Sequence, residues 1–298
     1  ERNTCDEVDW LDDLYVKVAW LKKNGKSIII VNGDLLYFPD ELCTSICKWI
    51  EDKYSIQRKN VIFNATHTHC AIHPGGNFFD GSIQDKKYEE YLLGIIKDAI
   101  DEGLNDLKES HLYIAKTKCN LGVNRRKFIV KAERLKKFRF KPVIANRPNP
   151  KAPVDDDLYV IKILRGERFD ACFINYSCHP SVLRGPYISA DFPGRIGPLL
   201  ARSTSNNISV FLQGYSGNIR PNLLSLAPSL FVAPKNFLIE LIEGSHFEKK
   251  TSEEDLDRIG ATIVERIMSI SEKDYDEIDI DIDSKEIEVD LPLAKVLP

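Results

Sequence analysis

The sequence predicts an α/β fold, with a mixed β-sheet flanked by helices in a single large domain. Short β-branched and apolar runs alternate with segments of helical periodicity along the chain. No internal repeat and no Pro-, Gly- or Ser-rich linker divides the 298 residues, which are enough for a sizeable core. We therefore expect one domain over residues 1–298.

The first part of the chain has a β-α-β-α rhythm. A hairpin is expected over 14–31, because Asn24-Gly25 favours a tight turn between two β-prone segments. A helix should begin at Pro39-Asp40 and end near Tyr54. A buried strand at 61–63 and a long helix over 85–107 follow.

The second part contains further strands and one long irregular segment. Residues 112–118 predict a strand, whereas 127–153 predict a long loop or lid, because Lys, Arg and Pro are frequent there and periodicity is weak. A hairpin should turn at Arg165-Gly166-Glu167, and a helix should start at Ser252, with Asp255 three residues on. Two more strands are expected, over 208–212 and in the acidic tail 279–291.

Composition excludes several classes of protein. The net charge of −4 gives no overall basic field for nucleic acid, and no run of about 18 apolar residues predicts a transmembrane helix. The seven cysteines are odd in number and lack CxxC spacing, which favours reduced thiols. No signal peptide is recognised at the start of the sequence. A cytoplasmic location is therefore predicted.

A histidine cluster is the strongest chemical signal. Three of the six histidines lie within seven residues, directly after the predicted strand 61–63. His67 and His69 are two residues apart, so in an extended chain both imidazoles would project from one face. The Pro74-Gly75-Gly76 loop that follows would let a ligand approach. Such a pair suits metal binding or proton transfer, although two histidines without a ligand are an alternative.

Other polar groups also follow predicted strands. They are Asp34, Asn124 with Arg125, His179, and the segment 216–222. Ligands of α/β sheets gather beyond the carboxyl ends of strands, so His179 could join His67 and His69 as nitrogen ligands of Zn²⁺. Asp34 could orient an imidazole or act only as a turn residue. His179 could equally be a hydrogen-bonded histidine in a turn before Pro180.

Alternative catalytic schemes lack their signatures. HExxH, GxSxG, GxxxxGK[ST] and a GxGxxG after a strand are all missing from the sequence. Cys70 and Cys178 each neighbour a histidine, but adjacent strand residues point to opposite faces. Both are expected to be buried thiols and not nucleophiles.

The motifs, taken in order, resemble a known enzyme family. Thr66-His67-Thr68-His69 with the downstream Pro74-Gly75-Gly76 is the most specific match, and Val123-Asn124-Arg125 is the second. Val154-Asp155, His179, Ile188-Ser189-Ala190-Asp191 and the 217–222 turn follow in the same order. The chain is similar to the N-terminal catalytic domain of the neutral/alkaline (non-lysosomal) ceramidases, as a divergent bacterial-type member. These enzymes are zinc-dependent amidases that cleave an N-acyl bond, and some are secreted.

The resemblance implies roles for individual residues. His67 and His179 would be zinc ligands, His69 would contact the reacting group, and Arg125 would help to hold substrate. Substrate-binding positions would be Asn124, Asn218, Gly75 and Gly76.

Two departures from the family pattern shape the expected function. Arg220 stands where ceramide-cleaving members carry the Ser assigned as nucleophile. A metal-activated water is then the expected nucleophile, with Arg220 holding an anionic group or oxyanion, or forming a structural ion pair. The family's further zinc ligands come from sequence beyond the stretch that residues 291–298 match. A missing C-terminal segment, a second chain, or Asp34, His69 or Asp191 would complete the metal site.

The sequence thus predicts a zinc-dependent amide hydrolase, or a related acyltransferase. Its substrate would be a small N-acylated or peptide-like linear amide other than ceramide. The alternative is a catalytically silent scaffold that binds a ligand or a partner chain.

Overall fold

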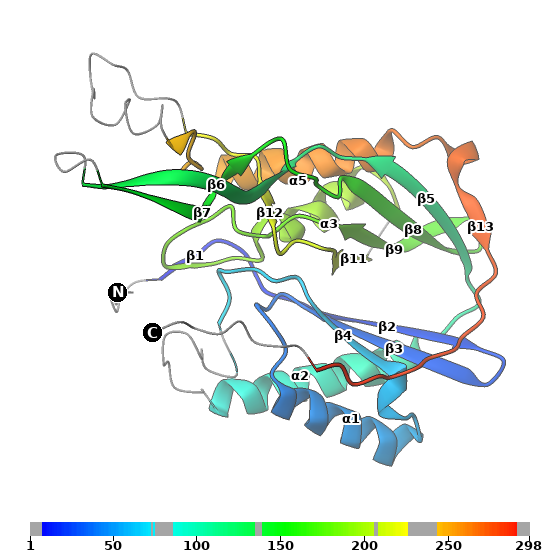
Figure 1. The fold of residues 1–298 in the computed structure, drawn as a ribbon. Coiled ribbons are helices and arrows are strands. Elements are labelled where there is room, and N and C mark those ends of the chain that lie inside the picture. Colours follow the sequence, from blue (N-terminus) through cyan, green and yellow to red (C-terminus); the bar gives the residue numbers. More distant parts are fainter. Residues whose placement is uncertain are drawn as a thin grey trace.

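The computed structural model describes residues 8–72, 74, 86–134, 139–205, 208–225 and 243–290, and it has the predicted α/β architecture (Figure 1). The helices are α1 (Asp40–Tyr54), α2 (Lys86–Asn105), α3 (Asp191–Ser203) and α5 (Glu253–Met268), with short 3₁₀ turns at Arg58–Asn60 and Glu272–Asp274. The strands are β1 (Asp9–Trp10), β2 (Val16–Lys23), β3 (Lys26–Gly33), β4 (Val61–Ala65), β5 (His111–Lys118), β6 (Gly122–Arg134), β7 (Arg139–Asn149), β8 (Asp157–Arg165), β9 (Arg168–Tyr176), β10 (Tyr187–Ile188), β11 (Ile208–Gln213), β12 (Ile219–Pro221) and β13 (Asp276–Ile278). In the described part of the chain, no helix combines the length and apolar character needed to cross a membrane.

One half of the fold is a five-stranded sheet in the order β11-β9-β8-β5-β13, with α3 and α5 on one side. β11 is parallel to β9, and the other pairs are antiparallel. The helices bury residues at i, i+4 spacing, as Phe192, Ile196 and Leu200 of α3 do. The capping box of Ser252 and Asp255 starts α5 where the sequence predicted it.

The other half is a three-stranded sheet in the order β2-β3-β4, covered by α1 and α2 in the lower part of Figure 1. β2 and β3 form the predicted hairpin, since Asn24 and Gly25 both have the positive φ of a tight turn. β4 runs parallel to β3. Ile29, Val31, Ile46 and Ile96 are buried in the core between this sheet and its helices.

Side-chain amides join the two halves where β4 meets β11. Asn64 Nδ2 donates to the Phe211 carbonyl at 3.0 Å, and Asn64 Oδ1 accepts from the Gln213 amide at 3.2 Å. Asn32 Nδ2 donates to the same Phe211 carbonyl at 2.8 Å. Asn64 therefore takes the place of a backbone ladder and sets the ends of the two strands side by side.

Replacing Asn64 by alanine should lower the free energy of unfolding by about 1–3 kcal/mol, because the Gln213 amide loses its partner in a partly buried position and the Phe211 carbonyl keeps only the hydrogen bond from Asn32. Urea denaturation measures this change. Ile62→Ala on the same strand is the control and should cost less, since that side chain is 47% exposed. Equal losses in the two variants would contradict the bridging role of Asn64.

Two sequence predictions of local structure were wrong. Residues 127–134 and 139–149 belong to β6 and β7 and not to a long loop. Alternation is present there, with Ile129 buried between exposed Phe128 and Val130, but the many Lys and Arg residues disguise it.

The acidic tail was the second error. Only Asp276–Ile278 forms a strand, and residues 279–290 have no regular secondary structure. Side-chain contacts fix this tail instead, with Asp279 paired to Lys23 and Ser284 Oγ donating to Asn60 Oδ1. Ile282 is buried, whereas its acidic neighbours lie in solvent.

Candidate metal centre

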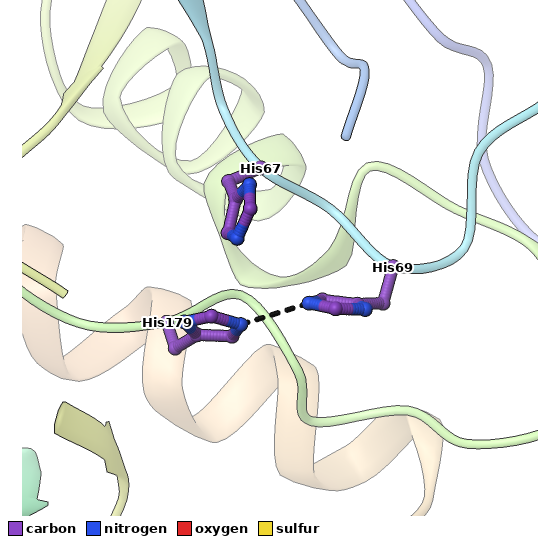
Figure 2. Close-up of side chains that lie close together, drawn as sticks. All are labelled: His67, His69 and His179. Carbon is purple, nitrogen blue, oxygen red and sulfur yellow. Dashed lines mark hydrogen bonds between the residues drawn. The ribbon is translucent and has the colours of Figure 1, made fainter. Parts of the chain in front are cut away.

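Three histidines meet beyond the ends of two strands that are distant in sequence. His67 and His69 follow β4, and His179 follows β9, as the sequence predicted from the strand ends. Figure 2 shows the three rings turned toward one point. One ring nitrogen from each histidine lies within 4.8 Å of those of the other two.

Backbone geometry fixes His67. Its φ of 68° lies in the left-handed region, which is uncommon outside glycine, and its amide donates to the Leu35 carbonyl at 2.9 Å. Its Nδ1 lies 2.7 Å from the Leu36 carbonyl oxygen, which can only accept a hydrogen bond. Nδ1 therefore carries the proton, and the lone pair of Nε2 is free for a metal.

The Thr66-His67-Thr68-His69 segment alternates as predicted, although the strand itself ends at Ala65. Thr66 and Thr68 are buried, and Thr68 Oγ1 donates to the Ser189 carbonyl at 2.8 Å. His69 is exposed and His67 half-buried. Because the two threonines that alternate with them point into the protein, both imidazoles lie on the opposite side of the segment, with ring centroids 5.3 Å apart.

His179 is the buried member of the three. Its backbone amide donates to the Ile219 carbonyl at 3.1 Å, and its Nδ1 faces the Ser216 carbonyl at 3.4 Å. Its Nε2 lies 2.8 Å from His69 Nε2, the contact drawn in Figure 2. The 216–219 turn thus contacts both the backbone amide and the ring Nδ1 of His179.

The electrostatics of this position favour a neutral imidazole. Burial, followed by the positive charge of Arg125 and by the two other histidines, lowers the pKa of His179 to about 3. A neutral imidazole is the form that binds metal. His179 is therefore in the protonation state that binds metal at neutral pH.

This shift predicts a pH dependence for the metal-free protein. Between pH 6.5 and 3 the unfolded chain would protonate His179 and the folded chain would not, so the free energy of unfolding should fall as pH decreases through this window. His179 should change the free energy of unfolding by at most about 1.4 kcal/mol per pH unit in this window. Urea titrations of wild-type and His179→Gln protein in chelator measure it. The same slope in both proteins would contradict the assignment.

Arg125 supports the turn beside His179. Its Nε and Nη2 donate to the Gly217 carbonyl at 3.0 and 2.8 Å, and its amide donates to the Asn218 carbonyl. Burial and then Arg126 lower the pKa of Arg125. Asn124 is buried. Its Nδ2 donates to the Pro153 carbonyl, and its Oδ1 accepts from the backbone amide of Arg126. The side chains of both residues therefore form hydrogen bonds to backbone groups, and their substrate roles stay predictions.

Arg220 is half-buried and lies on the same turn. Its Nη2 donates to the Ser181 carbonyl at 3.0 Å, and its guanidinium lies 4.8 Å from the centre of the Phe247 ring. Burial, then Arg184 and Arg125, lower its pKa to about 10. Among the described residues, neither Arg220 nor Arg125 has an ion pair with a carboxylate. The structural ion pair considered from sequence is therefore not found there.

The carboxylates considered from sequence have other partners. Asp34 accepts from the Tyr15 amide at 3.0 Å and lines a cavity of about 950 Å³ that none of the three histidines lines. The Leu36 carbonyl, and not Asp34, orients His67. Asp191 accepts hydrogen bonds from the backbone amides of Val182, Leu183 and Phe192. These bonds lower its pKa, but burial outweighs them and raises the pKa to about 6. Both carboxylates are occupied in holding the fold.

The remaining predictions at the site have mixed outcomes. Cys70 and Cys178 are buried as expected, and burial raises the pKa of Cys178. Asn218 is exposed, and its Oδ1 accepts from Arg126 Nε at 3.2 Å. His73, Gly75 and Gly76 lie outside the described residues.

Known proteins share this fold at low sequence identity. Neither a protein-family model nor a curated protein sequence matches the chain. Among solved structures, neutral ceramidase from Pseudomonas aeruginosa aligns over 86% of this chain and 38% of its own, with a TM-score of 0.61 and 18% identity. A ceramidase complexed with C2 aligns over 86% of this chain and 37% of its own, with a TM-score of 0.63 and 17% identity. The chain has a ceramidase-like fold.

This chain spans under two fifths of the length of either ceramidase. Sequence reasoning missed the groups that orient His67 and His179, namely the carbonyls of Leu35, Leu36 and Ser216. Backbone carbonyls are common to all residues, so no residue type marked them. The threonines that alternate with the histidines carried a signal that the sequence analysis did not use, since alternation in an extended segment places them on the opposite face.

Proposed function

We propose that this chain is a zinc-dependent hydrolase of N-acyl amide bonds. The convergence of His67, His69 and His179 beyond the ends of β4 and β9 is the observation that supports it most. The ceramidase-like fold and the motif order agree with this proposal. The substrate would be a small N-acylated or peptide-like molecule.

The donor atoms fit zinc. His67 and His179 each place Nδ1 against a backbone carbonyl, so each ring is oriented with Nε2 toward the common point. Two nitrogen ligands of a tetrahedral zinc ion lie ~3.3 Å apart, and the ring nitrogens of His67, His69 and His179 all lie within 4.8 Å of one another. Zinc sites usually have three or four protein ligands, so we propose that a further segment or a second chain completes the set.

Each residue of the site has a proposed task. Zinc held by His67 and His179 would supply Lewis acidity toward an acyl carbonyl and would lower the pKa of a water molecule. His69, the exposed ring of the three, would take a proton from the attacking water and deliver it to the leaving nitrogen. Arg125 would hold the substrate through the guanidinium hydrogens not used by Gly217.

Arg220 sets the expected substrate apart from ceramide. Arg220 stands at the sequence position where the ceramidase resemblance expects a Ser, and no described carboxylate forms an ion pair with its guanidinium. An arginine in this setting would bind an anionic substrate group or the developing oxyanion. We therefore propose that N-acyl substrates with a negative charge react faster than neutral ones.

A panel of N-acyl amino acids, N-acyl peptides and ceramide tests this function with zinc-loaded protein, with release of the free amine as the measurement. We expect turnover of charged N-acyl substrates and none after His179→Ala. Loss of the family Ser to Arg220 also favours a second candidate, a silent ligand-binding scaffold. Stoichiometric zinc without turnover of any substrate would support that scaffold and contradict the enzyme.

A further inference from the structure

The β6–β7 hairpin extends away from the body of the protein (Figure 1). The two strands pair with each other from Asn124↔Asn149 to Arg134↔Arg139. The only other strand paired with them in the described structure is β12, at the base over Gly122–Asn124. Beyond that base, the side chains of Phe128, Val130, Pro142 and Ile144 are exposed, so the face that carries them is open to solvent.

That open face carries a cluster of large apolar side chains. Phe128 is 68% exposed, Ile144 is 70% exposed and Val130 is 41% exposed. Phe128 lies directly opposite Ile144, and Val130 lies opposite Pro142, so the four residues are contiguous on one face of the pair. Ile129, on the other face, is buried. A contiguous exposed apolar cluster of this kind marks an interaction surface.

The charge of the hairpin is opposite to that of the rest of the chain. Residues 122–149 contain ten Lys and Arg and a single acidic residue, Glu133, which is a net charge of +9. Because the whole chain carries −4, the other 270 residues carry −13. Positive charge is thus concentrated on the one element that carries the exposed apolar cluster.

Basic residues also lie opposite one another in the register of the two strands. Lys131 pairs with Lys141, and Arg134 pairs with Arg139. Both strands of the hairpin therefore contribute to its positive charge.

We propose that the β6–β7 hairpin docks the protein onto an anionic lipid surface. Phe128, Val130, Pro142 and Ile144 enter the boundary between headgroups and acyl chains, and the net positive charge of the hairpin attracts the anionic headgroups. Basic residues near such a surface each contribute about 1 kcal/mol, and apolar side chains anchor the element. Nucleic acid fits less well, because three of the four apolar side chains are aliphatic and offer no ring for base stacking.

Vesicle sedimentation with the full chain tests this proposal. The probes are phosphatidylcholine vesicles with and without phosphatidylserine. Wild-type protein should bind only the anionic vesicles, and salt should weaken the binding. Phe128→Ser/Ile144→Ser and, separately, Lys131→Glu/Lys141→Glu should each weaken it by about tenfold or more. Thermal unfolding confirms that each variant is folded.

Two matched variants serve as controls. Tyr91→Ser removes a 65% exposed aromatic side chain from α2, and Lys48→Glu/Lys59→Glu makes the same change of charge on and beside α1. Both should bind anionic vesicles as the wild type does. Equal binding to neutral vesicles, no binding to either, or equal losses in the controls would overturn the proposal. Binding of single-stranded RNA in place of vesicles, or self-association abolished by Phe128→Ser/Ile144→Ser, would also overturn it.

Discussion

Alanine at His67 or at His179 should weaken zinc binding by about 100-fold or more. Each substitution removes an imidazole whose Nδ1 is already held by a backbone carbonyl, so the oriented Nε2 lone pair is lost. Competition with a chromophoric zinc chelator, carried out on metal-free protein, gives both affinities. The effect is large because a pre-oriented neutral ligand loses little entropy on binding.

His111→Ala is the control for this experiment. His111 is a surface histidine on β5, where its Nδ1 pairs with Glu277 at 2.8 Å. Its removal should leave the zinc affinity unchanged. If His67→Ala or His179→Ala kept wild-type affinity, or if His111→Ala weakened zinc to the same extent, the metal would lie elsewhere in the protein.

Glutamine at His69 should separate catalysis from metal binding. His69 is the exposed ring of the three and lies 2.8 Å from His179 through the two Nε2 atoms, which suits a group that exchanges protons with substrate. His69→Gln should keep the zinc and lower kcat by about 100-fold to 10,000-fold, the usual contribution of general acid–base catalysis. Steady-state kinetics and zinc content, both measured on the same sample, test the two statements together.

The pH profile gives a second readout for His69. The wild-type rate should depend on a titrating imidazole, and that limb of the profile should disappear in His69→Gln. If the variant instead lost its zinc, His69 would be a third ligand and not the proton carrier. If it lost neither zinc nor rate, His69 would have no part in the reaction.

The sequence predicted much of the fold because local signals agree with the final structure. Asn24-Gly25 set the first hairpin, Pro39-Asp40 began α1, and Ser252 with Asp255 began α5. It failed for β6 and β7 because the alternation of Phe128, Ile129 and Val130 lies among charged residues that also suit a loop. α3 was missed because Pro193, Gly194 and Pro198 interrupt its sequence, whereas tertiary packing of Phe192, Ile196 and Leu200 maintains the helix.

The candidate site was predictable to a different extent. The approach of His179 to His67 followed from both residues lying just after strand ends, which a sheet brings to one edge. The positions of Asp34 and Arg220 did not follow, because a buried side chain bonds to whichever backbone groups the fold brings near it. Asp34 faces Tyr15, and Arg220 faces Ser181. Such pairings depend on long-range packing and leave no pattern in the sequence.

Zinc K-edge X-ray absorption of the zinc-loaded protein tests the central claim, that the three histidines form a metal centre, most directly. The spectrum should show at least two imidazole nitrogens at about 2.0–2.1 Å and no sulfur ligand. The imidazole signal should be lost in His67→Ala/His179→Ala. A sulfur shell at about 2.3 Å would place zinc at the cysteines, and a spectrum unchanged by the double substitution would place it away from these histidines; either result would contradict the account.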